Sequence, residues 1–144
     1  MARLVGRGGL YFLIIPDKRY CFDHFLREST IADVLDAYLT QRRLHSARSI
    51  IEHRVLTGHN DPLRHWKGDH GSPLLDHKRL VEALAEIEAN RGKYVDVHAW
   101  QFTPQSFREV TDTLNKLALV PLRPLRVYET PAGRLEFCAV LHWP

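Results

Sequence analysis

A cluster of charged residues directly follows a strongly hydrophobic run of the sequence. Residues 10–15 read LYFLII, and the segment PDKRYCFDH comes next at 16–24. In open α/β sheets, ligands bind in loops at the carboxyl ends of strands, because those loops leave a rigid base. The substrate-binding candidates in this loop are Asp17, Lys18 and Arg19. The alternative is a solvated loop with a turn-forming proline, in which Asp17 pairs with a neighbouring basic side chain.

The same loop contains Asp23 and His24, the two residues that we expect to act in catalysis. An unperturbed imidazole titrates near neutrality, so it can act as a general base that takes a proton from a hydroxyl or amine group of a substrate. His98 and Trp100 lie just ahead of a predicted helix and are further substrate-binding candidates. The structural alternatives are that His24 bonds a backbone carbonyl and that Trp100 anchors the helix.

Histidines are concentrated between residues 53 and 77, and two aspartates lie among them. The set is His53, His59, Asp61, His65, Asp69, His70 and His77. Imidazole and carboxylate are suitable donors for a divalent metal. The stretch contains no HExxH motif and no short paired Cys or His spacing, and nine histidines in one chain make chance clustering common. The sequence therefore predicts no metal site, and a histidine-rich, metal-dependent hydrolase is kept as a lesser alternative.

Periodicity and capping residues predict the elements that position these candidates. The apolar run at 10–15 reads as a strand buried on both faces, as in a parallel sheet. Helices, an extended segment and a closing antiparallel hairpin are expected after it. The helices cover 29–43, 47–57, 74–91 and 102–120, the extended segment 94–100, and the hairpin strands 122–130 and 134–143. Residues 58–73 have no apolar period and are predicted to form a long loop.

Length and composition indicate a single globular domain spanning 1–144. The chain is 44% hydrophobic and 26% charged, which is ordinary for such a domain. No run approaches the roughly 18 apolar residues of a membrane span, so we expect a cytoplasmic protein without a membrane partner. The net charge of +3 forms no single block, which argues against nucleic acid. Cys21 and Cys138 fit no metal or redox spacing and are expected to be reduced thiols, with Cys138 packed in a strand.

Three segments, in this order, carry a resemblance to a known family. They are GRGGLYFLIIPDKRYCFDHF (6–25), YVDVHAWQFTPQSF (94–107) and LEFCAVL (135–141), and they resemble the C-terminal half of class I S-adenosylmethionine-dependent methyltransferases. The match runs over residues 3–142. The resemblance implies an α/β fold that is the C-terminal part of a Rossmann-like sheet, made of strands five, seven and six. It also implies a helical insertion at 25–92 that acts as a lid over the substrate.

The resemblance implies S-adenosylmethionine as cofactor, although the family binds it mainly upstream of the matched part. There, a glycine-rich loop after strand one holds the cofactor through close backbone approach and a helix N-terminus. The glycines at 6–9 precede a strand and cannot replace that loop. The resemblance therefore implies the acceptor-side half of a methyltransferase, inactive alone, whose acceptor is a small molecule or a glycan.

The implied strand order leaves one edge of the strand at 10–15 without a partner. In that order the strand at 134–142 lies between the strands at 10–15 and 123–129. An uncovered apolar edge invites pairing with another chain. We expect that the edge is covered by the helical insertion, by a second copy in a homo-oligomer, or by a complementing methyltransferase chain. The alternative function is a non-catalytic binding or regulatory module that pairs with a complete methyltransferase.

Overall fold

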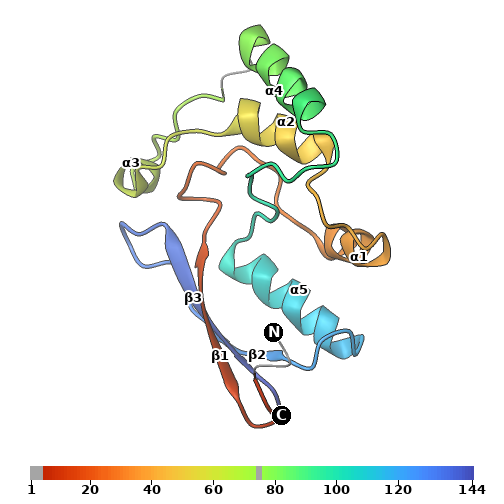
Figure 1. Cartoon of the computed structure of the whole chain (residues 1–144). Helices are drawn as coiled ribbons and strands as arrows, with labels where there is room; N and C mark the ends of the chain where they lie inside the picture. The colour runs from red at the N-terminus through yellow and green to blue at the C-terminus, as the bar shows by residue number, and fades with distance from the viewer. Residues whose placement is uncertain (1–4, 74–75) are drawn as a thin grey trace.

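The computed structural model describes residues 5–73 and 76–144, which form a three-stranded sheet and five helices (Figure 1). The strands are β1 (Leu10–Pro16), β2 (Arg123–Val127) and β3 (Glu136–His142). The helices are α1 (Ile31–Leu39), α2 (Ala47–Leu56), α3 (Pro62–Trp66), α4 (His77–Ala89) and α5 (Pro104–Lys116). Helix α5 lies along one side of the sheet, and α2 and α4 lie together at the opposite end of the molecule from the C-terminus.

The strand order of the sheet is β1-β3-β2, and β3 is antiparallel to both neighbours. Strand β3 therefore lies between the other two, as predicted, and β1 and β2 run parallel to each other. Because both hydrogen-bonded pairs are antiparallel, the described residues form no doubly wound parallel sheet. The fold is α/β with a small, open antiparallel sheet, and a Rossmann-like sheet order is not supported.

Strand β1 has one covered and one uncovered face, so the prediction that it is buried on both faces is wrong. Tyr11, Leu13 and Ile15 pack against the core, whereas Phe12 and Ile14 are 70% and 75% exposed. The physical reason is that α5 covers only one face of the sheet. Alternate residues of a strand point to opposite faces, so half of the apolar run lies in solvent.

The main core lies between α5 and the sheet. Phe107 of α5 packs edge-on against Phe137 of β3, with ring centroids 5.8 Å apart, and Ala139 and Leu141 extend the contact along β3. Helix α5 begins at the predicted cap: the Thr103 hydroxyl accepts a hydrogen bond from the Ser106 amide. Proline at the first helical position has no amide to satisfy, which also favours a start there.

A second, smaller core joins α2 to α4. Ile50, Val95 and Val97 are buried there, and Arg54 bonds Glu86 across the two helices at 2.8 Å. The segment 94–100 is not a strand, although its valines are buried in the predicted alternation.

The helices before α5 begin at side chains that cap them. Thr30 and Ser46 cap α1 and α2, as predicted, and Asp76 caps α4. The first two residues of the helix predicted at 74–91 lie outside the described residues. Helix α3 was not predicted: Asp61 accepts hydrogen bonds from the amides of Leu63 and Arg64 within the stretch expected to be a loop.

The two cysteines are free thiols with different environments. Cys21 is buried, and its burial raises its pKa to about 12. Cys138 lies in β3, as predicted, but it is exposed rather than packed, because it belongs to the uncovered face of the sheet. Among the described residues, no helix has the length and apolar character needed to cross a membrane.

Candidate functional site

The loop after β1 and the segment before α5 are joined by backbone hydrogen bonds. The Lys18 amide donates to the Phe102 carbonyl at 2.9 Å, and the Ser29 amide donates to the Gln101 carbonyl at 2.9 Å. The two segments that carry the predicted site residues, 16–24 and 98–100, therefore lie in the same region. This region is at the carboxyl end of β1, where the sequence analysis expected a site.

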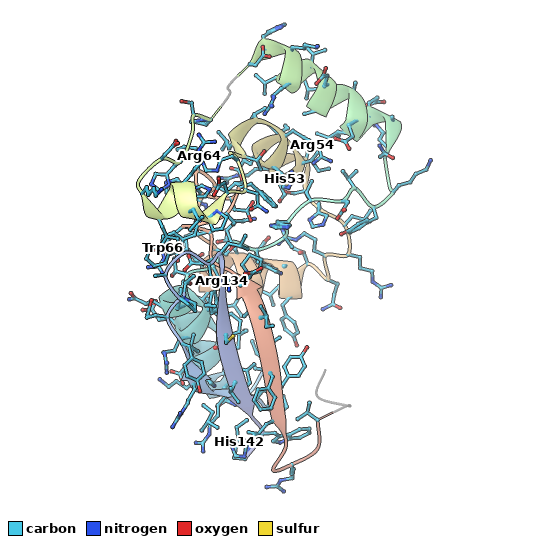
Figure 2. All side chains as sticks on the ribbon, turned by 90° about the vertical axis from the view of Figure 1, so that its left-hand side faces the viewer. His53, Arg54, Arg64, Trp66, Arg134 and His142 are labelled. Carbon is cyan, nitrogen blue, oxygen red and sulfur yellow. The ribbon has the colours of Figure 1, made fainter. Side chains whose placement is uncertain are left out.

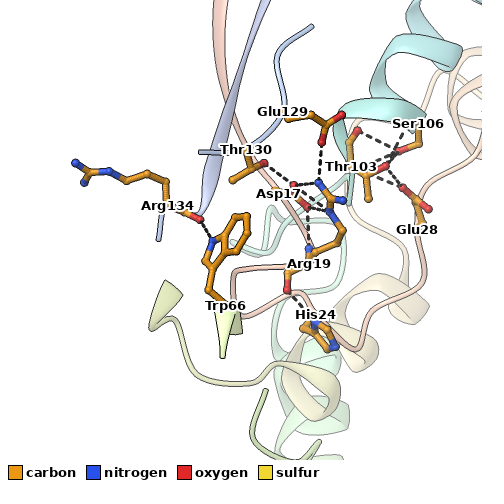
Figure 3. A network of polar contacts seen from close by, with 10 residues as sticks. All are labelled: Asp17, Arg19, His24, Glu28, Trp66, Thr103, Ser106, Glu129, Thr130 and Arg134. Atoms are coloured by element: carbon orange, nitrogen blue, oxygen red, sulfur yellow. Dashed lines mark hydrogen bonds and ion pairs between the residues drawn. The ribbon is translucent and has the colours of Figure 1, made fainter. Parts of the chain in front are cut away.

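Asp17 is completely buried and holds Arg19 in place (Figure 3). Its carboxylate accepts a hydrogen bond from the Arg19 guanidinium at 2.7 Å and one from the Thr130 hydroxyl at 2.5 Å. The hydrogen bond to Asp17 raises the pKa of Arg19. The pairing of Asp17 with a neighbouring basic residue, which the sequence left open, is thus present. Arg19 remains partly exposed and also approaches Glu129 at 3.5 Å.

Lys18 and His24 are both bonded to carbonyl groups of the loop itself. The Lys18 ammonium donates to the His24 carbonyl, and the His24 ring nitrogen Nδ1 donates to the Arg19 carbonyl, each at 2.9 Å. His24 therefore has the carbonyl contact that the structural alternative described. It has no hydrogen bond to Asp23, with which the sequence analysis had grouped it.

Asp23 pairs instead with His98, 75 positions further along the chain. His98 Nδ1 donates to Asp23 Oδ2 at 2.6 Å. Asp23 is 2% exposed, and its second oxygen, Oδ1, has no hydrogen-bond partner in the described part of the chain. The side chain of His98 is 39% exposed. The buried Asp23 carboxylate thus bonds, through one oxygen, a histidine that is accessible to solvent.

This pair has the properties of a general base. The hydrogen bond to Asp23 raises the pKa of His98, outweighing the opposite effect of burial. A carboxylate on Nδ1–H fixes the ring tautomer in which Nε2 carries the lone pair, and it stabilises the imidazolium that forms after proton transfer. The Phe22 ring lies 4.6 Å from the His98 ring, and the His53 ring lies 5.9 Å from it. The sequence missed this pairing because the two residues are brought together only by the fold.

Trp100 lines a polar cleft of about 320 Å³, which Ala99 and Gln101 also line but His98 and Asp23 do not. The other lining side chains come from the loop after β1, from α1, α2 and the segment between them, and from 99–101; they are Arg27, Ser29, Asp33, Asp36, Arg42, Ser46, Arg48, Ser49, Glu52, Ala99 and Gln101. The Arg42 guanidinium lies over the indole, 5.6 Å from the ring centroid. An aromatic face among hydrogen-bonding groups is suited to a polar ring such as a sugar.

A separate group of histidines lies at the loop that follows β1. His24, His65 and His70 each offer one ring nitrogen, and these three nitrogens lie within 4.8 Å of one another. His24 is a predicted catalytic residue, and the sequence predicts no metal site at His65 or His70. The fold brings them together because α3 and the residues after it lie against the loop that follows β1. Within residues 5–73 and 76–144, this is the group of side chains whose donor atoms are spaced for a divalent metal ion.

The described residues do not fit S-adenosylmethionine. The family holds it with a glycine-rich loop between a strand and a helix. Here β1 is followed by the charged loop, whose residue Asp17 is buried, and Gly6, Gly8 and Gly9 lie before β1 rather than after it. A chain with this arrangement offers the cofactor no glycine-rich loop of its own in the part that the structure describes.

Comparison of the chain with protein-family models, with curated proteins and with solved structures finds no match. The geometry of the Asp23–His98 pair, the Trp100 cleft and the sheet therefore carries the functional argument.

Proposed function

We propose that this chain is the acceptor-side half of a class I S-adenosylmethionine-dependent methyltransferase, and that it does not transfer methyl groups alone. The observation that carries the proposal is the arrangement of the sheet. An antiparallel β3 lies between β1 and β2, which run parallel to each other, and the far edge of β1 has no strand partner in the described residues. In this proposal β1, β3 and β2 are strands five, seven and six of a larger sheet, whose remaining strands join at β1.

The exposed apolar residues of β1 support the same interpretation. Leu10, Phe12 and Ile14 lie on the uncovered face, and each is about half exposed or more. Monomeric proteins rarely leave a contiguous apolar patch next to an unpaired strand edge. In a complete sheet, a neighbouring strand pairs with that edge and helices from the other half cover that face.

In this proposal His98 is the general base. As the acceptor reacts, its O–H bond breaks and the proton passes to Nε2 of His98, while Asp23 stabilises the resulting positive ring through Nδ1–H. Because Asp23 is buried, its charge acts on the ring through a medium of low dielectric constant. The methyl donor would be bound by the other half of the enzyme and would supply the methyl group that replaces the acceptor's proton.

The acceptor in this proposal is a glycan or a similar polyhydroxylated molecule that binds in the Trp100 cleft. The cleft is lined by both arginine and carboxylate side chains, which can bond sugar hydroxyls from either side. Helices α1 and α2 border the cleft and take the role of the lid that was assigned to the helical insertion.

The experiment begins with the coding DNA upstream of this chain. We expect an in-frame segment that encodes a glycine-rich strand–loop–helix unit. The joined polypeptide is then assayed for methyl transfer from radiolabelled S-adenosylmethionine to a panel of saccharides. The change His98→Ala is expected to lower the rate by about 10²- to 10⁴-fold, the usual contribution of a general base.

The matched control is His142→Ala, at the far end of β3 from the site (Figure 2). It is expected to leave the rate unchanged. An upstream region without such a unit contradicts the methyltransferase proposal and favours the non-catalytic pairing module. A His98→Ala polypeptide with an unchanged rate leaves the half-enzyme proposal standing and removes the general-base role.

A further inference from the structure

We propose that His24, His65 and His70 form a site for a divalent transition metal, with zinc as the best fit. The metal fastens the loop at 58–73 to the loop that follows β1. This proposal stands on a different group of residues from the Asp23–His98 pair and does not depend on methyl transfer.

The spacing of the donor atoms is close to that of ligands on one ion. Two nitrogens bound to a tetrahedral zinc lie roughly 3.4 Å apart, because each Zn–N bond is about 2.0–2.1 Å. His70 Nδ1–H donates a hydrogen bond to His65 Nδ1 at 3.0 Å, and metal binding replaces this proton with the ion. The donor nitrogen of His24 is within 4.8 Å of the other two. Because the rings of His24 and His70 are stacked almost parallel, at least one of these two partly exposed rings must turn for three lone pairs to meet at one ion.

Backbone carbonyls orient two of the three rings in the way that metal-binding histidines require. His24 Nδ1–H donates to the Arg19 carbonyl at 2.9 Å, which leaves the lone pair on Nε2. His65 Nε2–H donates to the His59 carbonyl at 3.0 Å, which leaves the lone pair on Nδ1. A metal-binding histidine almost always donates its other ring N–H to a carbonyl, a carboxylate or water. Both outer contacts of the proposed site are therefore already present.

The rings of the three histidines lie close to one another. The rings of His24 and His70 are stacked with centroids 3.6 Å apart, and the centroid of the His65 ring lies 5.2 Å from that of His70. A metal ion binds the uncharged form of each imidazole.

The loop at 58–73 is held mainly by polar contacts and by the stacking of Trp66 on Tyr20. Helix α3 has five residues, fewer than a helix needs to be stable alone in water. Its apolar side chains Leu63 and Trp66 are exposed, and the side chain it buries is His65, which is 2% exposed. Trp66 donates a hydrogen bond to the Arg134 carbonyl, which tethers the outer side of the helix (Figure 3). A metal at His65 stabilises the inner side, where a hydrophobic residue would otherwise be expected.

The experiment uses the full chain after treatment with a chelator, and the probes are Zn²⁺ and Co²⁺ alone. Calorimetry is expected to give one zinc per chain. Cobalt is expected to give the intense visible absorption of a tetrahedral ion. His24→Ala and His70→Ala are each expected to weaken zinc binding by at least about 100-fold. Loss of a residue that only bonds a metal ligand costs up to about 100-fold, and loss of the ligand itself costs more.

The matched control is His77→Ala, because His77 is an exposed residue from the same histidine-rich stretch. It is expected to bind zinc as tightly as the parent chain. His65 is buried, so its replacement can unfold the loop, and the cobalt spectrum of the unchanged chain tests the site without that variant. A chain that binds no zinc overturns the proposal, as does zinc binding that survives His70→Ala or is lost in His77→Ala.

Discussion

At the scale of single residues, the two buried carboxylates of the loop after β1 have different roles. Asp17 is fully bonded, by Arg19 and Thr130, and its position fixes the path of the loop. Asp23 bonds His98 through one oxygen and leaves the other without a partner in the described residues. A buried polar atom without a partner is costly, so it is retained where the site gains from it. Asp23, rather than Asp17, is therefore the carboxylate that can take part in a reaction.

Asp23→Asn is expected to lower the pKa of His98, because the replacement removes the hydrogen bond to a charged acceptor that raises it. An NMR titration of the imidazole signals measures this pKa. The control is Asp96→Asn, since Asp96 affects His98 only through its charge and is exposed. A shift in Asp96→Asn as large as that in Asp23→Asn contradicts the assigned pairing.

The same change has a predicted effect on stability. The pKa of His98 is higher in the folded chain than in the unfolded one, so protonation favours folding. This contribution is fully present below about pH 6.5, the ordinary histidine pKa, and is lost as the pH rises through the raised value. The stability difference between the parent chain and Asp23→Asn, measured by urea unfolding, is therefore expected to narrow above pH 6.5.

At the scale of elements, α5 depends on its first turn. The Thr103 hydroxyl accepts from the Ser106 amide at 3.2 Å and donates to Glu28 at 2.6 Å, which ties the helix to the loop before α1. Helix α5 in turn covers the core face of the sheet. The cap therefore contributes both to the helix and to the position of the site segment that precedes it.

Thr103→Ala is expected to destabilise the chain by about 1 kcal/mol, the typical cost of losing an N-cap side chain. Urea unfolding followed by circular dichroism measures the loss. Thr103→Ser keeps the hydroxyl and is expected to retain most of the stability. Equal destabilisation by both changes would mean that the methyl group, not the cap, is what matters at this position.

The helices could be predicted because their signals are local. Caps such as Thr30 and Thr103, followed by apolar side chains on one face, are visible in the sequence itself. Helix α3 had the same kind of signal, an aspartate before a proline, but its five residues are too few to develop a period. The two faces of β1 were mistaken because six consecutive apolar residues do not reveal which face a helix covers.

The site could be predicted only in part. The charged loop and the segment at 98–100 were both identified, since each lies next to a predicted element. The pairing of Asp23 with His98 and the grouping of His24 with His65 depend on contacts between distant parts of the chain. Such contacts follow from packing, which one sequence read locally does not contain.

At the scale of the whole molecule, the described residues cover the sheet on one face only. Phe12 and Ile14 lie on the open face beside the unpaired edge of β1. We expect the isolated chain to associate with itself through this region in a concentration-dependent way, because both the apolar surface and the unpaired backbone groups favour it.

Ile14→Lys is expected to abolish this association, because it puts a charge on the open face next to the edge. Analytical ultracentrifugation over a range of concentrations measures it. Leu39→Lys is the control, since Leu39 is similarly exposed but lies at the end of α1, away from the sheet. A parent chain that sediments as a monomer at every concentration contradicts the prediction.

Because the two thiols have different environments, one of them can be labelled selectively. Cys21 is buried and resists ionisation, whereas Cys138 is exposed and lies opposite Ile14 in the β1–β3 register. The thiolate is the reactive form, so a maleimide dye labels position 138 and spares position 21. A change in the fluorescence of that dye then reports the binding of another molecule to the solvent-exposed face of the sheet.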